Sequence, residues 1–400
     1  MSGIIIIGAG QAGSSMAIKL RALGYNDAIT LIGDEAIPPY QRPPLSKKYL
    51  LGEMKLDRLF LRPPNFYGEQ EIDLRLNTCV DIIKPIEKII QVGNETLSYD
   101  KLALTTGSTP RLLPKSIGGE LNGVFSVRSV ADVDAMQSSF DEGSRVLIIG
   151  GGYIGLEAAA VAALKGLKVT LVEMSNRILK RVACKETSDY FRKLHVNHGV
   201  TIMEGVGLDQ LVGEDHVQSA ILSNGKTLDI DFAIVGVGIL PETTLAEAAG
   251  INLNNGIEID SQGRTSAPDI WAAGDCTSFP FQGARIRLES VPNAIDQAEV
   301  VASNMLGAEQ DYTATPWFWS DQYEIKLQIA GLNAGYSDIV VRNDDTAQSH
   351  WYYRSEKLLA VDAMNDPRAY MVAKRLIEAG LTADPEIVAN PKVNLKDLLK

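Results

Sequence analysis

The sequence predicts an α/β protein in which one strand–loop–helix–strand unit occurs twice within 400 residues. The first copy starts with the apolar run 4–7, IIII, which passes directly into GAGQAG at 8–13. A helical stretch follows as far as Leu23, and the apolar run 28–32, AITLI, predicts a second strand. This succession is typical of parallel strands that are joined by a crossover helix.

The second copy has the same order of elements at nearly the same lengths. The run 145–149, RVLII, enters GGGYIG at 150–155, a helical stretch continues to Lys165, and KVTLV at 168–172 predicts the closing strand. A single loop of this kind would be weak evidence, because glycine-rich turns are common. Two copies, each between an apolar strand and an alanine-rich helix, indicate two Rossmann-like dinucleotide-binding units.

The glycines at the first, third and sixth positions of each loop have separate tasks. The first allows a tight turn off the strand, the second lets the backbone approach a pyrophosphate, and the third lets the helix pack closely on the strand. The helix N-terminus then supplies amide hydrogens and the positive end of its dipole to the phosphates. These glycines are Gly8, Gly10 and Gly13 in the first loop and Gly150, Gly152 and Gly155 in the second.

The end of the closing strand differs between the two copies. Glu173 follows the second closing strand, whereas the first copy has Gly33 at this position and Asp34 one residue later. A carboxylate here accepts hydrogen bonds from a ribose 2′-hydroxyl and repels a 2′-phosphate, so the second unit is expected to prefer NAD over NADP. Three nearby cations weaken that preference: Arg177, Lys180 and Arg181.

Two dinucleotide sites in one chain favour two cofactors that exchange electrons, a nicotinamide that delivers hydride and a flavin that receives it. The stretch IWAAGD at 270–275 supports the flavin, because a short strand that ends in Gly274-Asp275 can bring a carboxylate to a ribitol or ribose hydroxyl. We therefore expect FAD and NADH as cofactors. Hydride transfer between stacked rings needs no acid, base or nucleophile, and the sequence offers no convincing catalytic triad.

Composition and charge argue against other classes of protein. The apolar fraction of 45% and the charged fraction of 22% are typical of a folded globular protein. The 38 Lys and Arg residues against 50 Asp and Glu residues give a net charge of −12, which argues against a nucleic-acid partner. No run of about 18 apolar residues predicts a membrane span, and the N-terminus lacks the cationic start of a signal peptide.

Cysteines and histidines are few. Cys79, Cys184 and Cys276 are far apart and odd in number, so we expect buried, reduced cysteines, no metal site and a cytoplasmic protein. We interpret the histidines as exposed or hydrogen-bonded residues in polar, irregular surroundings without a catalytic role. They are His195, His198, His216 and His350.

Several stretches resemble a known family. The two glycine loops, AGD at 273–275 and LTTG at 104–107 are similar to those of glutathione-reductase-type flavoproteins, although TTG stands where ATG is usual. Four longer stretches resemble the bacterial NADH-dependent ferredoxin reductases, a group that includes putidaredoxin reductase and delivers electrons to P450s and Rieske-type dioxygenases. These stretches are YQRPPLSK at 40–47, GGYIGLE at 151–157, ESVPNA at 289–294 and PWFWSDQ at 316–322.

The resemblance, which extends to about residue 365, implies a domain organisation. Residues 1–109 and 239–315 would form a discontinuous FAD-binding domain, with an NAD-binding domain inserted at 110–238. Residues 316–400 would form a small C-terminal α+β domain, a β-rich cap. Its short strands are expected at 325–330, 339–341 and 351–353.

The resemblance also implies the residues that contact the cofactors. Those implied for FAD are Gly8, Gly10, Ala12, Gly13, Asp34, Arg42, Lys47, Val80, Arg128, Gly274, Asp275, Val291 and Trp319. Those implied for NAD are Gly150, Gly152, Tyr153, Ile154, Gly155, Glu173 and Gly238, with Glu289 close to the nicotinamide end.

The resemblance implies that Lys47 and Glu157 are the catalytic residues. It places Lys47 near flavin N5 and pairs it with Glu157. A cation at that position would stabilise the anionic reduced flavin, and the glutamate would keep the lysine oriented and charged. Without the resemblance, Lys47 is an ordinary solvated lysine, and Glu157 is an ordinary glutamate near a helix N-terminus.

The destination of the electrons follows from a missing pair of thiols. Disulfide reductases of this fold carry two close cysteines beside the flavin, near where this chain has PYQRPP at 39–44. We therefore expect electrons to leave the flavin directly and singly for an external acceptor. The resemblance implies that this acceptor is a small iron–sulfur ferredoxin, expected to be of the 2Fe–2S type. An NADH oxidase or rubredoxin reductase on the same fold, or a flavin-bound NADH-sensing scaffold, are the alternatives.

A ferredoxin partner requires a local cationic surface, because ferredoxins are usually acidic and this chain is acidic too. We expect at least two cations to form a docking site beside the Trp317–Trp319 stretch. The candidates are Arg285, Arg287, Lys326, Lys48 and Arg62.

Overall fold

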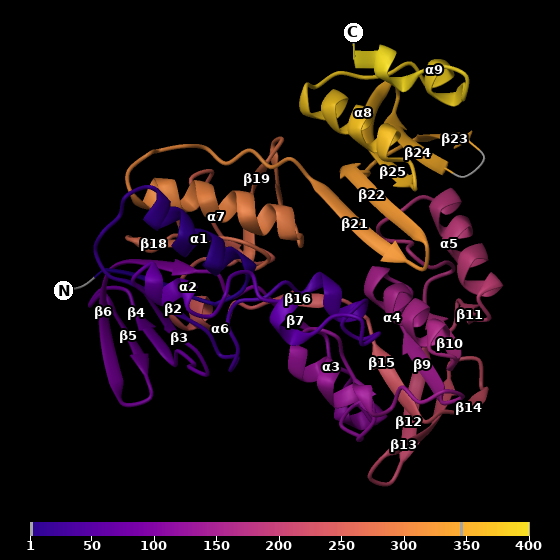
Figure 1. The fold of residues 1–400 in the computed structure, drawn as a ribbon, viewed down its shortest axis with the longest axis horizontal. Helices are drawn as coiled ribbons and strands as arrows, with labels where there is room; N and C mark the ends of the chain where they lie inside the picture. Colours follow the sequence, from indigo (N-terminus) through magenta and orange to yellow (C-terminus); the bar gives the residue numbers. More distant parts are fainter. Residues whose placement is uncertain (1–2, 345–346, 400) are drawn as a thin grey trace. The chain divides into compact units, whose positions relative to one another are not determined.

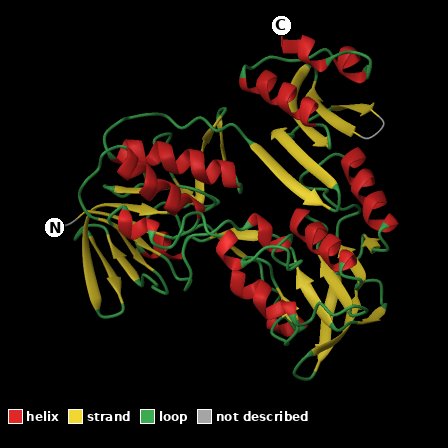
Figure 2. Cartoon of the chain, in the orientation of Figure 1, coloured by secondary structure: helices red, strands yellow, loops and turns green. Residues whose placement is uncertain are grey.

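The computed structural model describes residues 3–344 and 347–399, which divide into two compact units (Figure 1). The α/β class predicted from the sequence is confirmed by their helices and sheets (Figure 2). The division into three domains stays a prediction. Within the described residues, unit 1 comprises the chain up to Gln41, Lys55–Thr109 and Ile239–Pro316, and unit 2 comprises Arg42–Met54, Pro110–Gly238 and the chain from Trp317 onward.

A mixed sheet forms the centre of unit 1. Its strand order is β3-β2-β1-β6-β5-β4, and β18 pairs with β6. Strand β1 runs parallel to β2 and β6, as expected for the first copy of the repeated unit, and it is buried along its whole length. The strands are β1 Gly3–Ile7, β2 Ile29–Ile32, β3 Ile72–Arg75, β4 Ile82–Lys84, β5 Ile89–Val92, β6 Glu95–Leu104 and β18 Ile270–Ala272.

Two helices that are far apart in the sequence lie side by side in unit 1, α1 Gln11–Ala22 and α7 Val291–Met305 (Figure 1). Met16 of α1 and Val301 of α7 share one buried cluster with Ile6 of β1, so this core holds both helices against the sheet. The other elements of unit 1 are short: α2 Phe66–Glu69, α6 Thr244–Ala248, β16 Ile239–Pro241, β17 Ile257–Glu258, β19 Thr277–Phe281 and β20 Ala284–Ile286, while β7 Ser108–Pro110 pairs with β16.

The second copy of the repeated unit forms a parallel sheet in unit 2, with the order β11-β10-β9-β15-β8. A three-stranded antiparallel sheet, β12-β13-β14, accompanies it. The elements are β8 Val124–Phe125, α3 Val130–Gln137, β9 Arg145–Ile149, α4 Tyr153–Leu164, β10 Lys168–Glu173, α5 Lys185–Asn197, β11 Thr201–Glu204, β12 Leu208–Gly213, β13 Val217–Leu222, β14 Thr227–Asp229 and β15 Phe232–Val235.

The C-terminal part of unit 2 is an antiparallel sheet, β21-β22-β25-β24-β23, with α8 packed against it. Its strands are longer than the three short strands expected from the sequence. None of the helices in the described ranges has the length and apolar character that are needed to cross a bilayer. The elements are β21 Trp317–Gln322, β22 Ile325–Gly331, β23 Asp338–Asp344, β24 Ala347–Arg354, β25 Lys357–Met364, α8 Pro367–Glu378 and α9 Pro385–Ala389.

Two expectations about single residue types are wrong. Cys79 is exposed rather than buried. His195 and His350 are hydrogen-bonded, as expected, but they are fully buried within α5 and β24 and do not lie in irregular polar surroundings. The helical or strand periodicity of their segments was the signal for a buried position.

Candidate functional site

The loop between β1 and α1 contains the first group of glycines. Gly8 has φ of +110°, and a Cβ there would lie 2.2 Å from the Thr105 carbonyl oxygen. A Cβ at Gly13 would lie 2.0 Å from the Gly8 carbonyl oxygen. The packing of the chain itself therefore requires these two glycines. At Gly10, by contrast, no described atom lies within 4 Å of a Cβ, so the backbone is open to the close approach of a pyrophosphate.

The loop between β9 and α4 repeats this arrangement. Gly150 has φ of +108°, and its Cβ would lie 2.4 Å from the Gly236 carbonyl oxygen. A Cβ at Gly155 would lie 2.1 Å from the Gly150 carbonyl oxygen, whereas Gly152 again has no described atom within 4 Å. Of the first, third and sixth positions in each loop, the fold therefore needs glycine at the first and sixth, and only a ligand would use the third.

The helices behind the two loops keep their first amides available. Among the described residues, α1 and α4 have no capping side chain at Gly10 or Gly152 and no acidic residue in the first turn. Helix α3 is different, because Ser129 and Asp132 close its N-terminus in a capping box. Uncapped amides and the positive end of the dipole suit a phosphate, so both loops fit the dinucleotides that the sequence predicts.

The Gly-Asp turn after β18 lies next to the first loop, because β18, β6 and β1 run parallel and their carboxyl ends share one edge of the sheet. A Cβ at Gly274, where φ is +88°, would lie 3.1 Å from the Cβ of Ala12. Ser108 Oγ donates to Asp275 Oδ2 at 3.2 Å, and the Gly274 amide donates to Gln297 of α7 at 2.8 Å. The structure therefore gathers the glycine loop and this carboxylate at one edge of unit 1.

Thr105, which departs from the usual Ala-Thr-Gly, contributes to the same edge. Its hydroxyl donates to the carbonyl oxygens of Ile7 at 3.1 Å and Gly8 at 2.8 Å. The departure therefore adds hydrogen bonds that hold the first turn of the loop.

Glu173 is the last residue of β10 and lies beside the second loop. Its Oε2 accepts from the Gly151 amide at 2.8 Å and its Oε1 accepts from the Ser175 amide at 2.7 Å. Arg177, one of the cations expected to weaken NAD preference, donates instead to Ser188 Oγ at 2.5 Å. This hydrogen bond engages one of the cations that would otherwise attract a 2′-phosphate.

A buried ion pair lies in unit 2. Lys47 Nζ is 2.9 Å from Glu157 Oε1, and the two side chains are 15% and 2% exposed. Ser46 Oγ donates to Glu157 Oε2 at 2.5 Å, and Ser320 Oγ donates to Oε1 at 2.6 Å. A buried charge is costly unless it is paired and hydrogen-bonded, and here the carboxylate is both. The arrangement holds one lysine charge at a fixed point.

Helix α4 meets β21 on a shared face that carries the glutamate. Tyr153 and Glu157 are four residues apart on α4, and the Tyr153 ring lies 5.1 Å from that of Phe318, while Ser320 bonds Glu157. Ile154, also predicted to contact NAD, is exposed. The sequence reasoning missed Ser46 and Ser320. The signal was present for Ser320, because alternate residues of a strand share one face and Phe318 and Ser320 alternate.

The other residues predicted to contact cofactors in unit 1 are spread along its sequence. Asp34 is exposed just after β2, Val80 packs partly buried on a core cluster, and Val291 is the first residue of α7. Glu289 forms an ion pair with Arg287. Their contacts with a nucleotide stay predictions.

Among the residues of unit 2 that are predicted to contact cofactors, Arg42 and Arg128 form a hydrogen bond that joins two segments of the chain. Arg42 Nη1 donates to the Arg128 carbonyl oxygen at 2.6 Å. Gly238 has φ of +107°, and its carbonyl oxygen accepts from the Arg111 amide at 2.9 Å. The ring of Trp319 lies 5.6 Å from that of Trp317.

Two of the five cations expected at a docking surface have partners inside unit 1. Arg285 Nη2 donates to the carbonyl oxygens of Ile259 at 2.5 Å and Ser278 at 2.9 Å, and Arg287 is paired with Glu289. These bonds leave three exposed candidates, Lys48, Arg62 and Lys326.

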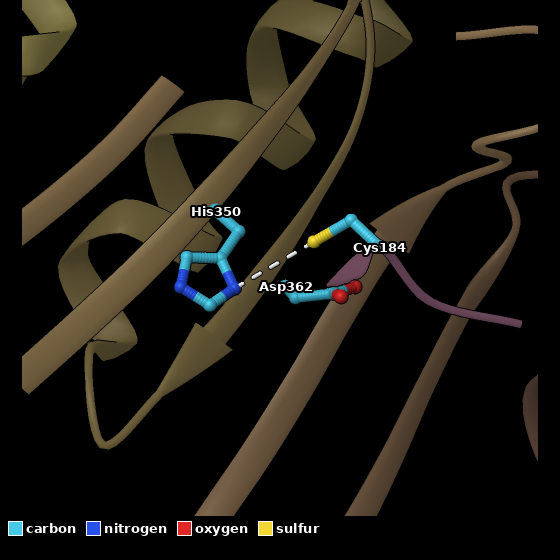
Figure 3. Close-up of side chains that lie close together, drawn as sticks. All are labelled: Cys184, His350 and Asp362. Carbon is cyan, nitrogen blue, oxygen red and sulfur yellow. Dashed lines mark hydrogen bonds between the residues drawn. The ribbon is translucent and has the colours of Figure 1, made fainter. Parts of the chain in front are cut away.

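A second buried polar group in unit 2 is formed by Cys184, His350 and Asp362, whose ligand-type atoms lie within 4.8 Å of one another (Figure 3). Cys184 Sγ is 3.9 Å from His350 Nδ1. The hydroxyl oxygen of Thr187 lies between them, 2.7 Å from His350 Nδ1, 2.7 Å from Asp362 Oδ2 and 3.3 Å from Cys184 Sγ. A zinc ion would have to lie at the centre of the cluster, about 2.0–2.3 Å from each ligand atom. The Thr187 hydroxyl occupies that position, so the cluster is a hydrogen-bond network.

Burial sets the protonation of this network. Loss of hydration raises the pKa of Asp362 to about 6 and lowers the pKa of His350 to about 4. Burial also raises the pKa of the Cys184 thiol. A thiol of this kind is an unreactive structural group, here the N-cap of α5.

A family model described as pyridine nucleotide-disulphide oxidoreductase matches residues 2–298, and one described as reductase C-terminal matches residues 317–399. The chain belongs to the pyridine nucleotide-disulphide oxidoreductase family. Members of this family use FAD and NAD(P)H, and both loops fit a dinucleotide, so the expected cofactors and oxidoreductase class are confirmed.

Relatives within the pyridine nucleotide-disulphide oxidoreductases are similar along nearly their whole length. The ferredoxin reductase subunit of the 5,5′-dehydrodivanillate O-demethylase of Sphingobium is 39% identical, over 98% of this chain and 97% of the relative. Putidaredoxin reductase of Pseudomonas putida is 38% identical over 99% and 96%. The crystal structure of the covalent putidaredoxin reductase–putidaredoxin complex superimposes with a TM-score of 0.96 at 36% identity, covering 100% of this chain and 98% of that one.

Proposed function

We propose that this protein takes hydride from NADH onto FAD and passes the electrons singly to a small 2Fe–2S ferredoxin that serves a P450 or a ring-hydroxylating dioxygenase. The proposal rests on two observations taken together: two glycine loops whose backbone is open to a dinucleotide, and no pair of cysteines at 39–44, where disulfide reductases of this fold carry one. The segment 39–44 contains no cysteine, and two of the three free cysteines are buried. The similarity to reductases of this kind over 98–99% of the chain supports the same acceptor.

The chain's own residues would bind and orient. When bound, FAD supplies the chemistry of accepting a hydride and returning electrons one at a time. Gly10 and Gly152 would admit the two pyrophosphates, and Glu173 would accept from the ribose of NADH and repel a 2′-phosphate. Lys47, held by Glu157, would supply a fixed positive charge that favours the reduced, anionic flavin.

The proposal includes a cytoplasmic location. Three unpaired cysteines, one of them exposed, suit a reducing compartment better than an oxidising one.

Reduction of cytochrome c by NADH, with and without a purified 2Fe–2S ferredoxin, tests the proposed acceptor. We expect the rate to depend strongly on the ferredoxin. Fast oxygen consumption that needs no ferredoxin would indicate an NADH oxidase instead. Equal reduction of a rubredoxin and the ferredoxin would remove the stated specificity.

A further inference from the structure

A line of buried hydrogen bonds continues from Glu157 into the interior of unit 2. Ser320 Oγ donates to Glu157, Gln322 Nε2 donates to Ser320 Oγ at 3.2 Å, and His195 Nε2 lies 2.8 Å from Gln322 Oε1. Tyr323 Oη lies 3.3 Å from His195 Nδ1 and ends the line. Ser320 and Gln322 share one face of β21, while His195 comes from α5, so two elements build it.

The hydrogen bonds along this line all point the same way. Burial lowers the pKa of His195 to about 4, so the ring is neutral at pH 7 and carries one proton. Gln322 presents its oxygen to Nε2, so that nitrogen must hold the proton and donate it. Nδ1 then accepts from Tyr323, whose pKa is raised by burial so that its hydroxyl stays protonated. Each donor is aimed toward Glu157.

Burying three polar side chains along this line costs desolvation free energy. Ser320, Gln322 and His195 are each 0% exposed. Apolar residues of similar volume could fill such positions without the desolvation cost, so stability gives little reason for the polar residues. Their common feature is the carboxylate at the inner end. Because Ser320, Gln322 and His195 are all neutral, their hydrogen bonds direct dipoles at Glu157 without adding a charge that would compete with Lys47.

We propose that Ser320, Gln322 and His195 are positioning residues that orient the Glu157 carboxylate and through it fix the charge of Lys47. The inference rests on the role proposed above for the Lys47–Glu157 pair. If Ser320 stops donating, Glu157 loses one of its two hydroxyl donors and can turn away from Lys47. The lysine charge is then no longer held at one point, so the reduced flavin is stabilised less.

The test compares Ser320→Ala with Ser349→Ala in the holoprotein. Ser349 is a matched control, because its hydroxyl is also 0% exposed in the same sheet but bonds Asp366 and Trp351 instead of Glu157. For Ser320→Ala we expect normal FAD content, an unchanged KM for NADH, flavin reduction slowed about three- to tenfold, and a lower flavin midpoint potential. Gln322→Leu should shift the same quantities in the same direction by less. Ser349→Ala should leave all of them at the wild-type values.

Two further variants distinguish failure of the positioning role from failure of the role proposed for the Lys47–Glu157 pair. Glu157→Gln measures the effect of the pair itself. If Glu157→Gln changes the potential but Ser320→Ala matches Ser349→Ala, the positioning role is wrong and the proposed function is unaffected. If Glu157→Gln also changes nothing, the role of the pair and the positioning role both fail. Should Ser320→Ala not fold, Gln322→Glu replaces it: its carboxylate can only accept from Ser320, so an unchanged potential would overturn the inference.

Discussion

At the scale of single residues, Glu173 is the residue that we propose selects NADH over NADPH at the second loop. In Glu173→Gln the carboxylate charge is removed while the side-chain shape is kept. We expect kcat/KM for NADH to fall about tenfold and the NADH-to-NADPH ratio to narrow, because the ribose acceptor is weakened and the repulsion of a 2′-phosphate disappears. Steady-state kinetics with both nucleotides measures this ratio.

Glu204 supplies the control for that variant. It is paired in register with Glu173 on the neighbouring strand β11, and its Oε1 also accepts a backbone amide, from Ile178 at 2.8 Å. Glu204→Gln should leave the ratio unchanged. A wild-type ratio in Glu173→Gln would show that another residue discriminates between the nucleotides.

Asp362 and His350 have opposite effects on stability between about pH 4 and pH 6. The raised pKa of Asp362 gives it a proton only in the folded state, so its contribution is full at low pH and is lost as the pH rises through about 6. Because the pKa of His350 is lowered in the folded state, the folded protein binds fewer protons than the unfolded chain in this range. The stability that the neutral His350 ring contributes is therefore lost as the pH falls toward about 4. The two contributions offset each other over most of this range.

Asp362→Asn removes the contribution of Asp362 to the pH dependence of stability and leaves that of His350. We expect the free energy of unfolding to rise more steeply with pH than in the wild type between about pH 4 and pH 6, by about 1.4 kcal/mol per pH unit. Urea unfolding at several pH values measures the slope, with the exposed Asp338→Asn as control. An unchanged slope would mean that Asp362 does not keep its proton in the folded protein.

At the scale of elements, the two kinds of glycine in each loop can be separated. A Cβ at Gly155 would meet the Gly150 carbonyl oxygen at 2.1 Å, whereas at Gly152 no described atom lies within 4 Å. We therefore expect Gly155→Ala to lower the melting temperature and Gly152→Ala to leave it near the wild-type value while raising the KM for NADH about tenfold or more. Thermal unfolding and NADH kinetics measure the two effects. Equal destabilisation by both variants would contradict the assignment of Gly152 to the ligand.

The elements that could be predicted from the sequence are those whose signals are local. Each glycine loop lies within a few residues of its strand and helix, and Glu173 directly ends β10. The bond between Ser320 and Glu157 joins residues 163 positions apart, and the bond between His195 and Gln322 joins residues 127 apart. No periodicity reports such pairs, because they depend on how α4, α5 and β21 pack. For the same reason, the sequence predicts a surface cation at Arg285, although the carbonyl oxygens of Ile259 and Ser278 hold its side chain.

At the scale of the whole molecule, the net charge of −12 makes partner binding sensitive to salt. If Lys48, Arg62 or Lys326 meets an acidic ferredoxin, higher ionic strength should slow ferredoxin reduction and leave NADH-to-ferricyanide turnover nearly unchanged. Parallel assays over a salt series make the comparison. Equal salt sensitivity of both reactions, or none in either, would indicate mainly apolar docking.

The central claim is that electrons enter the protein from NADH and leave directly from FAD, with no thiol pair between. Anaerobic titration of the purified, yellow protein with NADH, followed by the visible absorbance of the flavin, tests it most directly. The account predicts that one NADH per chain bleaches one FAD completely, because two electrons fill the single redox centre that the account assigns to the protein. Uptake of two NADH per chain would reveal a second two-electron centre, such as a redox-active disulfide, and would contradict the account.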